Sequence, residues 1–224
     1  MRRFVRENGL TLSFGIAFLL ALAGHAIAGH TEFNNQQAAD GLAQIGLGDY
    51  LMSSDFAVDV TENWQSEYLQ FFLYITVTVW LLQRGSPESK EMHKAGKESD
   101  KEQRVGRHAR EDSPRWAGAG GMRQAVFSRS LGLVMGTIFV LSWLVQATAG
   151  VSAYNEQQLR QLQAPISWGA YVGSADFWSR TLQNWQSEFL AVASMAILSV
   201  YLRQRGSPES KPVGAPHSAT GVEG

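Results

Sequence analysis

A pentapeptide, Asn-Trp-Gln-Ser-Glu, occurs twice in this chain, at residues 63–67 and 184–188. Each copy opens an apolar run, and each run ends in a second repeated stretch, Gln-Arg-Gly-Ser-Pro-Glu-Ser-Lys, at residues 83–90 and 204–211. The distance between the copies is the same for both motifs, so the two halves of the chain align without a gap. This repeat constrains the fold strongly, because both halves are expected to form the same structural unit.

A further apolar run precedes each pentapeptide. Residues 9–29 carry no charged side chain unless His25 is protonated, and about 20 apolar residues are enough for a helix to cross a hydrocarbon core of roughly 30 Å. The arginine-rich start and the small residues at 26–28 also fit a cleaved signal peptide. The equivalent run at 127–150 lies in the middle of the chain and cannot be an N-terminal signal, which favours a retained membrane span in the first half.

The sequence therefore predicts an all-α membrane protein with four transmembrane helices. They form two tandem helical hairpins inserted in the same direction, with short helices on the outer face. The expected divisions are a first repeat at 1–90, a flexible charged linker at 91–125, a second repeat at 126–211 and a disordered tail at 212–224. The linker mixes both signs of charge without apolar periodicity, so it cannot bury enough apolar surface to offset its ordering entropy. The expected spans are residues 9–29, 63–84, 127–150 and 184–205.

Positive charge indicates how these spans are oriented. Nearly all lysine and arginine residues lie in the N-terminal arm, the linker and the tail, whereas the two loops between spans contain only Arg160 and Arg180. The positive-inside rule then places both termini and the linker in the cytoplasm. The net charge of −1 gives no argument for nucleic-acid binding. The absence of cysteine excludes disulfides, zinc–thiolate sites and thiol chemistry.

Polar residues at membrane depth are the first candidates for a functional site. Helix geometry places Glu67 and Glu188 about 25 Å above the inner boundary, in the outer part of the membrane. Ionisable groups there are costly unless they are paired or wetted, so they are functional candidates. The candidate polar layer comprises Glu67, Glu188, His25, Gln146, Gln65 and Gln186. A structural interpretation competes with a cation, proton or ligand site, because buried polar groups are usually satisfied by hydrogen bonds within the protein.

The start of the helix distinguishes these two interpretations. If the helices begin at Asn63 and Asn184, the pentapeptide is simply a favourable first turn, in which the glutamate suits the helix dipole. If they begin near Asp55 and Asp176, the glutamates lie several turns inside the helix and need partners. The second half has no equivalent of His25, so a symmetric two-metal site is not expected. No metal ligand set, cofactor motif or catalytic constellation is identified.

The second repeated motif has an incomplete structural explanation. Its glycine is suited to ending a helix, its proline prevents continuation, and its basic residues suit lipid headgroups. These roles explain why the motif contains glycine, proline and basic residues. They do not explain why all eight residues are the same in both copies. A cytoplasmic docking surface is the alternative, with Arg84, Ser86, Glu88, Lys90, Arg205, Ser207, Glu209 and Lys211 as its candidate residues.

The paired motifs, with the Ala-Gly endings of the first and third apolar runs, resemble a family of small bacterial integral membrane proteins catalogued as a domain of unknown function. The resemblance covers residues 4–90 and 127–211. It implies a multi-pass protein of the bacterial inner membrane and transfers no activity. We expect a non-enzymatic structural or accessory subunit of a membrane complex, in contact with membrane lipid. The expected partner is another membrane protein or further copies of the chain in a homo-oligomer. The alternative function is a small cation or proton transporter, or a ligand-binding membrane protein, that uses the polar layer.

Overall fold

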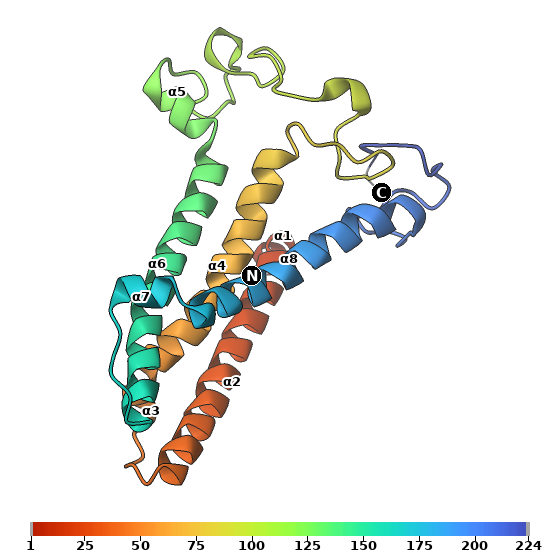
Figure 1. Ribbon diagram of the computed structural model, residues 1–224. Coiled ribbons are helices and arrows are strands. Elements are labelled where there is room, and N and C mark those ends of the chain that lie inside the picture. Colours follow the sequence, from red (N-terminus) through yellow and green to blue (C-terminus); the bar gives the residue numbers. More distant parts are fainter. Residues whose placement is uncertain (1, 223–224) are drawn as a thin grey trace. The chain divides into compact units, whose positions relative to one another are not determined.

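The computed structural model describes residues 2–222, and every regular element in that range is a helix (Figure 1). The prediction of an all-α protein is therefore confirmed. In chain order the α-helices are α1 (Arg2–Glu7), α2 (Gly9–Ala39), α3 (Leu47–Leu51), α4 (Ser54–Val77), α5 (Met122–Phe127), α6 (Ser130–Arg160), α7 (Trp168–Val172) and α8 (Ala175–Tyr201). Between α4 and α5 the chain forms turns and two 3₁₀ helices, Met92–Lys94 and Gly106–His108.

Two of these helices, α2 and α6, are long and apolar enough to cross a membrane. Each has 31 residues, which at 1.5 Å per residue gives a length of roughly 46 Å. Only 6% of the most apolar window of α2 is buried, and 17% of that of α6. A core helix of a soluble protein would bury most of such a window. Exposed apolar side chains along a long helix are the pattern expected where lipid surrounds the helix.

The helices that carry the pentapeptides begin well before them. The hydroxyl oxygen of Ser53 accepts a hydrogen bond from the amide of Phe56 at 3.2 Å, and that of Ser174 accepts one from Phe177 at 3.3 Å. These contacts satisfy amide groups that a first helical turn leaves unpaired. The interpretation in which the helices start at residues 63 and 184 is therefore wrong, and both glutamates lie several turns inside their helices.

The chain divides into two compact units, which are described one at a time. The first unit comprises residues 2–61 and 145–177, and therefore contains α1 to α3, the start of α4, the end of α6, α7 and the first residues of α8. The second comprises residues 62–144 and 178–222, with the remainder of α4, α6 and α8, the linker and the tail.

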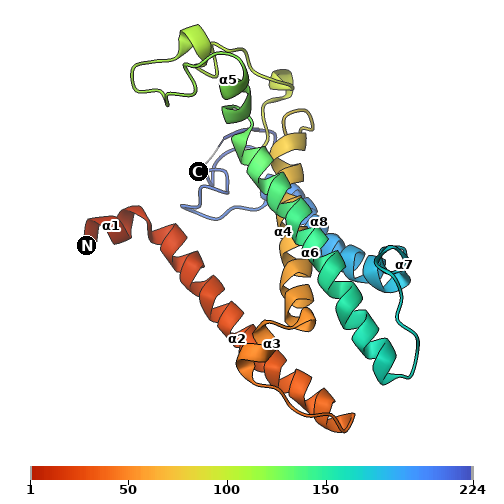
Figure 2. The ribbon, with the colours of Figure 1, turned by 90° about the vertical axis from the view of Figure 1, so that its left-hand side faces the viewer.

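In the first unit, equivalent residues of the two halves make equivalent contacts. The short helix α3 lies against α2 (Figure 2), and its buried Tyr50 places its hydroxyl where a side chain on Gly29 would otherwise lie. Tyr171 of α7 occupies the same position against Gly150 of α6. A Cβ atom at either position would collide with the tyrosine hydroxyl, so glycine fits both positions.

An asparagine in each half closes the loop that leads into the short helix. The side chain of Asn34 accepts from the amide of Ile45 at 2.9 Å and donates to its carbonyl at 3.0 Å. Asn155 makes the same two bonds with Ile166, at 2.8 and 3.0 Å. An amide side chain can bond both backbone groups of one residue in this way, because it carries a donor and an acceptor side by side.

In the second unit, α6 packs closely against α4. A Cβ atom on Gly136 would lie 3.1 Å from the ring of Phe72, and one on Gly132 would lie 3.6 Å from the methyl group of Thr76. Small residues let two helix backbones approach closely, and α4 is the helix that these two glycines approach.

Candidate functional site

The two copies of the pentapeptide lie in different environments although their sequences are identical. Gln65 on α4 is fully buried, and its carbonyl oxygen accepts a hydrogen bond of 2.8 Å from the indole nitrogen of Trp185 on α8. Its amide group donates to the carbonyl of Glu62 at 3.1 Å. The counterpart, Gln186, is exposed. The first copy thus supplies a buried acceptor, and the second copy supplies the tryptophan that donates to it.

Further contacts near the pentapeptides join α8 to α4 and α6 within the second unit. The guanidinium of Arg180 donates to the carboxylate of Glu62 at 3.2 Å. The ring of Trp185 lies 5.9 Å, centroid to centroid, from that of Trp143 on α6, and Trp178 lies 6.1 Å from the same ring. These aromatic contacts tie α8 to α6 as well as to α4.

The glutamates of the pentapeptides are more accessible than the glutamine. Glu67 is exposed and Glu188 is half-buried. Both belong to the second unit, and the charge of Glu67 acts on the carboxylate of Glu188. A proton or a cation bound beside two like charges relieves their repulsion.

The remaining members of the predicted layer, His25 and Gln146, belong to the first unit. The Nε2 atom of His25 lies 3.8 Å from a carboxylate oxygen of Asp59, and its ring lies 5.5 Å from that of Phe56. Gln146 is fully buried, and neither its amide nitrogen nor its carbonyl oxygen has a hydrogen-bond partner in the described part of the chain. Buried amides of this kind are usually satisfied by an ordered water or another polar group.

A cluster of charged groups that the sequence did not indicate lies in the first unit. Burial and the nearby carboxylates of Glu156 and Asp59 raise the pKa of Asp55 above its usual value, against the opposing effect of Arg160. One carboxylate oxygen of Asp55 is buried without a hydrogen-bond partner in the described structure. Arg160 itself donates to Asp40 at 3.3 Å and to Glu156 at 2.5 Å. These groups come from segments far apart in the sequence, so no local pattern could have predicted the cluster.

The second motif forms the same loop in both copies, which explains most of its residues. The glycines, Gly85 and Gly206, have φ angles of +88° and +81°, a region that favours glycine. The hydroxyl of Ser89 accepts from the amide of Gln83 at 2.9 Å and donates to the carbonyl of Lys90 at 3.1 Å. In the second copy Ser210 makes the same two bonds, to Gln204 and Lys211, with the same lengths.

The lysine at the end of the motif fastens the chain that follows it. The ammonium group of Lys90 donates to the carbonyl of Gly96 at 2.9 Å, and that of Lys211 donates to the equivalent carbonyl of His217 at 2.9 Å. Lys90 also forms an ion pair of 2.5 Å with Glu98. These contacts account for a lysine at this position in both copies without invoking a partner.

Lys211 is almost fully buried and extends these contacts into the first copy. Its ammonium donates to the carbonyl of Gly85 at 2.6 Å, and it lies within 3.3 Å of the carbonyls of Pro216 and Ala219. The amide of Gly85 donates to the hydroxyl of Thr220 at 2.9 Å. The tail, which composition alone suggests to be disordered, therefore has defined contacts with the first motif over these residues.

The candidate docking residues differ in how accessible they are. Arg84, Glu88, Arg205 and Glu209 are exposed, and the hydroxyl of Tyr74 donates to the carboxylate of Glu88. The other candidates are partly or fully buried, namely Ser86, Lys90, Ser207 and Lys211. A partner could therefore reach the exposed arginines and glutamates but not the buried residues. Within residues 2–222 no group of three or more histidine or acidic side chains could hold a metal ion.

Comparison with known proteins identifies the family. A family model described as a domain of unknown function (DUF6766) matches residues 1–222. The chain belongs to this family. No curated protein and no solved structure matches it. The resemblance that the paired motifs indicate is thus confirmed at the level of the family, which carries no assigned activity.

Proposed function

We propose that this chain is a multi-pass protein of the bacterial inner membrane that acts as a non-enzymatic structural or accessory subunit of a membrane complex. In this proposal α2, α4, α6 and α8 span the bilayer as two tandem hairpins, and both termini and the linker lie in the cytoplasm. The exposed apolar surfaces of α2 and α6 support the membrane location. The repeated loop and glycine contacts support the division into two equivalent hairpins.

The polar contacts that the pentapeptide residues make between helices are the main support for a structural role. Its buried glutamine accepts from Trp185 across two helices, and Arg180 pairs with Glu62 beside it. Within a low-dielectric environment such polar contacts hold helices in one arrangement. This supports a fixed helical scaffold whose accessible motif residues, Arg84 and Arg205, are available to a partner.

Native mass spectrometry after gentle extraction from the source membrane tests the proposal. We expect a discrete complex that contains another membrane protein. Replacing Arg84 and Arg205 by glutamine should release that partner, whereas replacing the exposed linker residues Arg107 and Arg110 should not. A bare monomer, or a homo-oligomer alone, under conditions that keep other membrane complexes intact would refute the accessory role.

A second candidate function is transport of a proton or small cation. The specific observation in its favour is the electrostatic interaction between Glu67 and Glu188 on neighbouring helices. Reconstitution into proteoliposomes with a pH-sensitive dye tests it. Flux that disappears in the Glu67→Gln/Glu188→Gln variant but persists in Glu102→Gln/Glu111→Gln, which removes the same charge from exposed linker residues, would establish transport. No flux above that of empty vesicles would eliminate it.

A further inference from the structure

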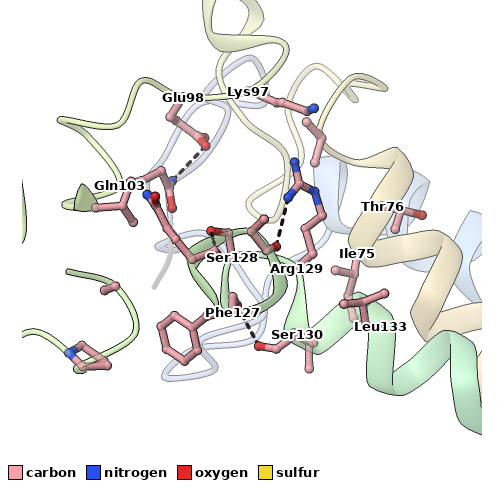
Figure 3. A pocket seen from close by; sticks show the side chains of 18 of the residues that line it. Ile75, Thr76, Lys97, Glu98, Gln103, Phe127, Ser128, Arg129, Ser130 and Leu133 are labelled. Carbon is pink, nitrogen blue, oxygen red and sulfur yellow. Dashed lines mark hydrogen bonds between the residues drawn. The ribbon is translucent and has the colours of Figure 1, made fainter. Parts of the chain in front are cut away.

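A groove of 1590 Å³ lies in the second unit, between α4, α6 and the linker (Figure 3). The two helices contribute an apolar wall, formed by residues such as Phe72, Ile75, Val79, Leu133 and Val140. This volume exceeds the roughly 300–1,000 Å³ of pockets for drug-sized ligands. The groove is therefore large enough for a molecule with long apolar chains.

The other part of the groove is polar, because the linker and the residues just before α6 line it. Arg129 lies between the linker side chains Lys97 and Glu98 and the apolar residues Ile75 and Leu133 in Figure 3. Its guanidinium donates one hydrogen bond, to the carbonyl of Ala125 at 3.0 Å. A guanidinium has five N–H donors, so others remain for an anion such as a phosphate.

The charges that line the groove favour an anionic ligand. Its basic residues are Lys97, Arg104 and Arg129, and its acidic residues are Glu98, Asp100 and Asp112. Glu98 is already neutralised by an ion pair of 2.5 Å with Lys90. The ammonium of Lys97 also lies 6.0 Å from the ring centroid of Trp80, an aromatic residue of the type that lies at membrane interfaces. With Glu98 paired, three basic groups and two acidic groups remain among the residues that line the groove.

We propose that the groove binds one anionic phospholipid. Its acyl chains lie along the apolar wall of α4 and α6, and Lys97 and Arg129 hold its phosphate. Basic pockets between helices on the cytoplasmic side of a membrane are suited to anionic headgroups. The inference rests on the proposed membrane function, because only in a bilayer do the ends of α4 and α6 meet lipid headgroups.

Native mass spectrometry of the purified protein, with phosphatidylglycerol or phosphatidylcholine added in equal amounts, tests this site. We expect one tightly retained phosphatidylglycerol per chain and no comparable retention of phosphatidylcholine. The Lys97→Gln/Arg129→Gln variant should lower this preference by about twenty-five-fold, about fivefold for each basic residue removed. The Lys101→Gln/Arg123→Gln variant removes the same charge from exposed residues outside the groove, and should keep the preference.

The outcomes separate this inference from the membrane proposal. Equal retention of both lipids, or equal loss of preference in both variants, would overturn the lipid site. A 50-fold excess of inorganic phosphate should not displace the lipid, because phosphate does not occupy the apolar wall. Displacement by phosphate would show that the site takes a free anion instead. Circular dichroism verifies that each variant is folded, and alkaline carbonate extraction shows whether the chain is integral to the membrane whatever the lipid result.

Discussion

Replacing Lys211 by methionine tests how the tail is fastened. The ammonium of Lys211 donates to the carbonyls of Gly85 at 2.6 Å and His217 at 2.9 Å, and it is 1% exposed. Methionine keeps the apolar stem but removes the donors, so the buried carbonyls lose their partner. A hydrogen bond to a charged group contributes about 1.5–3 kcal/mol. The substitution also removes the cost of burying a charged ammonium, which offsets part of the loss. We therefore expect a net cost of about 3 kcal/mol for the two best bonds.

Amide hydrogen exchange measures this cost directly. The amide of Gly85 donates to Thr220, and the amide of Gly221 donates to the carbonyl of Ser86 at 3.0 Å, so both report whether the tail is closed. A loss of about 3 kcal/mol should raise the exchange rate of these amides about 100-fold, since each 1.4 kcal/mol is a factor of ten. Far-UV circular dichroism should be unchanged, because no helix depends on this contact.

The equivalent change at Lys90 is the matched control. Lys90 holds the equivalent position in the first copy of the loop, but its side chain is 27% exposed, so water can replace part of its contacts. We expect Lys90→Met to cost about 1 kcal/mol, with faster exchange at Gly96, whose amide donates to the carbonyl of Val79 at 2.7 Å. Unchanged protection of the tail in Lys211→Met, or equal release of the tail in both variants, would refute the reasoning.

Two further predictions concern individual buried groups. Gln65→Leu should lower the melting temperature, because it leaves the indole of Trp185 without its acceptor. The expected decrease is roughly 2–4 °C for each kcal/mol of stability lost. Gln186 is exposed, so Gln186→Leu should have little effect. Asp55→Asn should stabilise the protein at pH 7 and lose this advantage in acid, whereas the exposed Asp49→Asn should leave stability unchanged at both pH values. Burial and neighbouring carboxylates raise the pKa of Asp55 in the folded state. Its ionised form therefore costs stability above that pKa, and the cost disappears as the pH falls through it. Thermal melts at pH 7 and pH 4 measure both effects, and an Asp55→Asn variant that is less stable than the parent at pH 7 would contradict the second.

The helical elements were largely predictable because their signals are local. Apolar runs of sufficient length predict the four long helices and roughly where they lie. The glycine and proline of the second motif do not mark the helix ends, because α4 ends at Val77 and α8 at Tyr201, before Gly85 and Gly206. The starts of α4 and α8 were less certain because the stretch before each pentapeptide is polar and resembles a loop. Ser53 and Ser174 begin the helices there by accepting amide hydrogen bonds, which is a contact that a hydropathy pattern does not indicate.

The environment of the candidate site was harder to predict, because sequence fixes depth along a helix but not rotation about its axis. Gln65 and Gln186 stand in identical pentapeptides, yet one is buried and the other is exposed. The contacts of Lys211 with Gly85 join residues far apart in the chain. The composition of the tail suggests disorder. Only the folded structure shows that carbonyl groups of the tail accept hydrogen bonds from the buried ammonium of Lys211.

Site-directed cysteine labelling tests the central claim, that four spans place both termini and the linker on one side of the membrane. The chain has no cysteine, so each introduced thiol reports one position. The exposed residues Asp49 and Gln163 represent the two outer loops, and Ser99 and Ser218 represent the linker and the tail. A membrane-impermeant maleimide applied to intact spheroplasts should label the first two positions, and should label the last two only after the membrane is permeabilised. Labelling of the two loops from opposite sides, or of the linker from outside, would contradict the account.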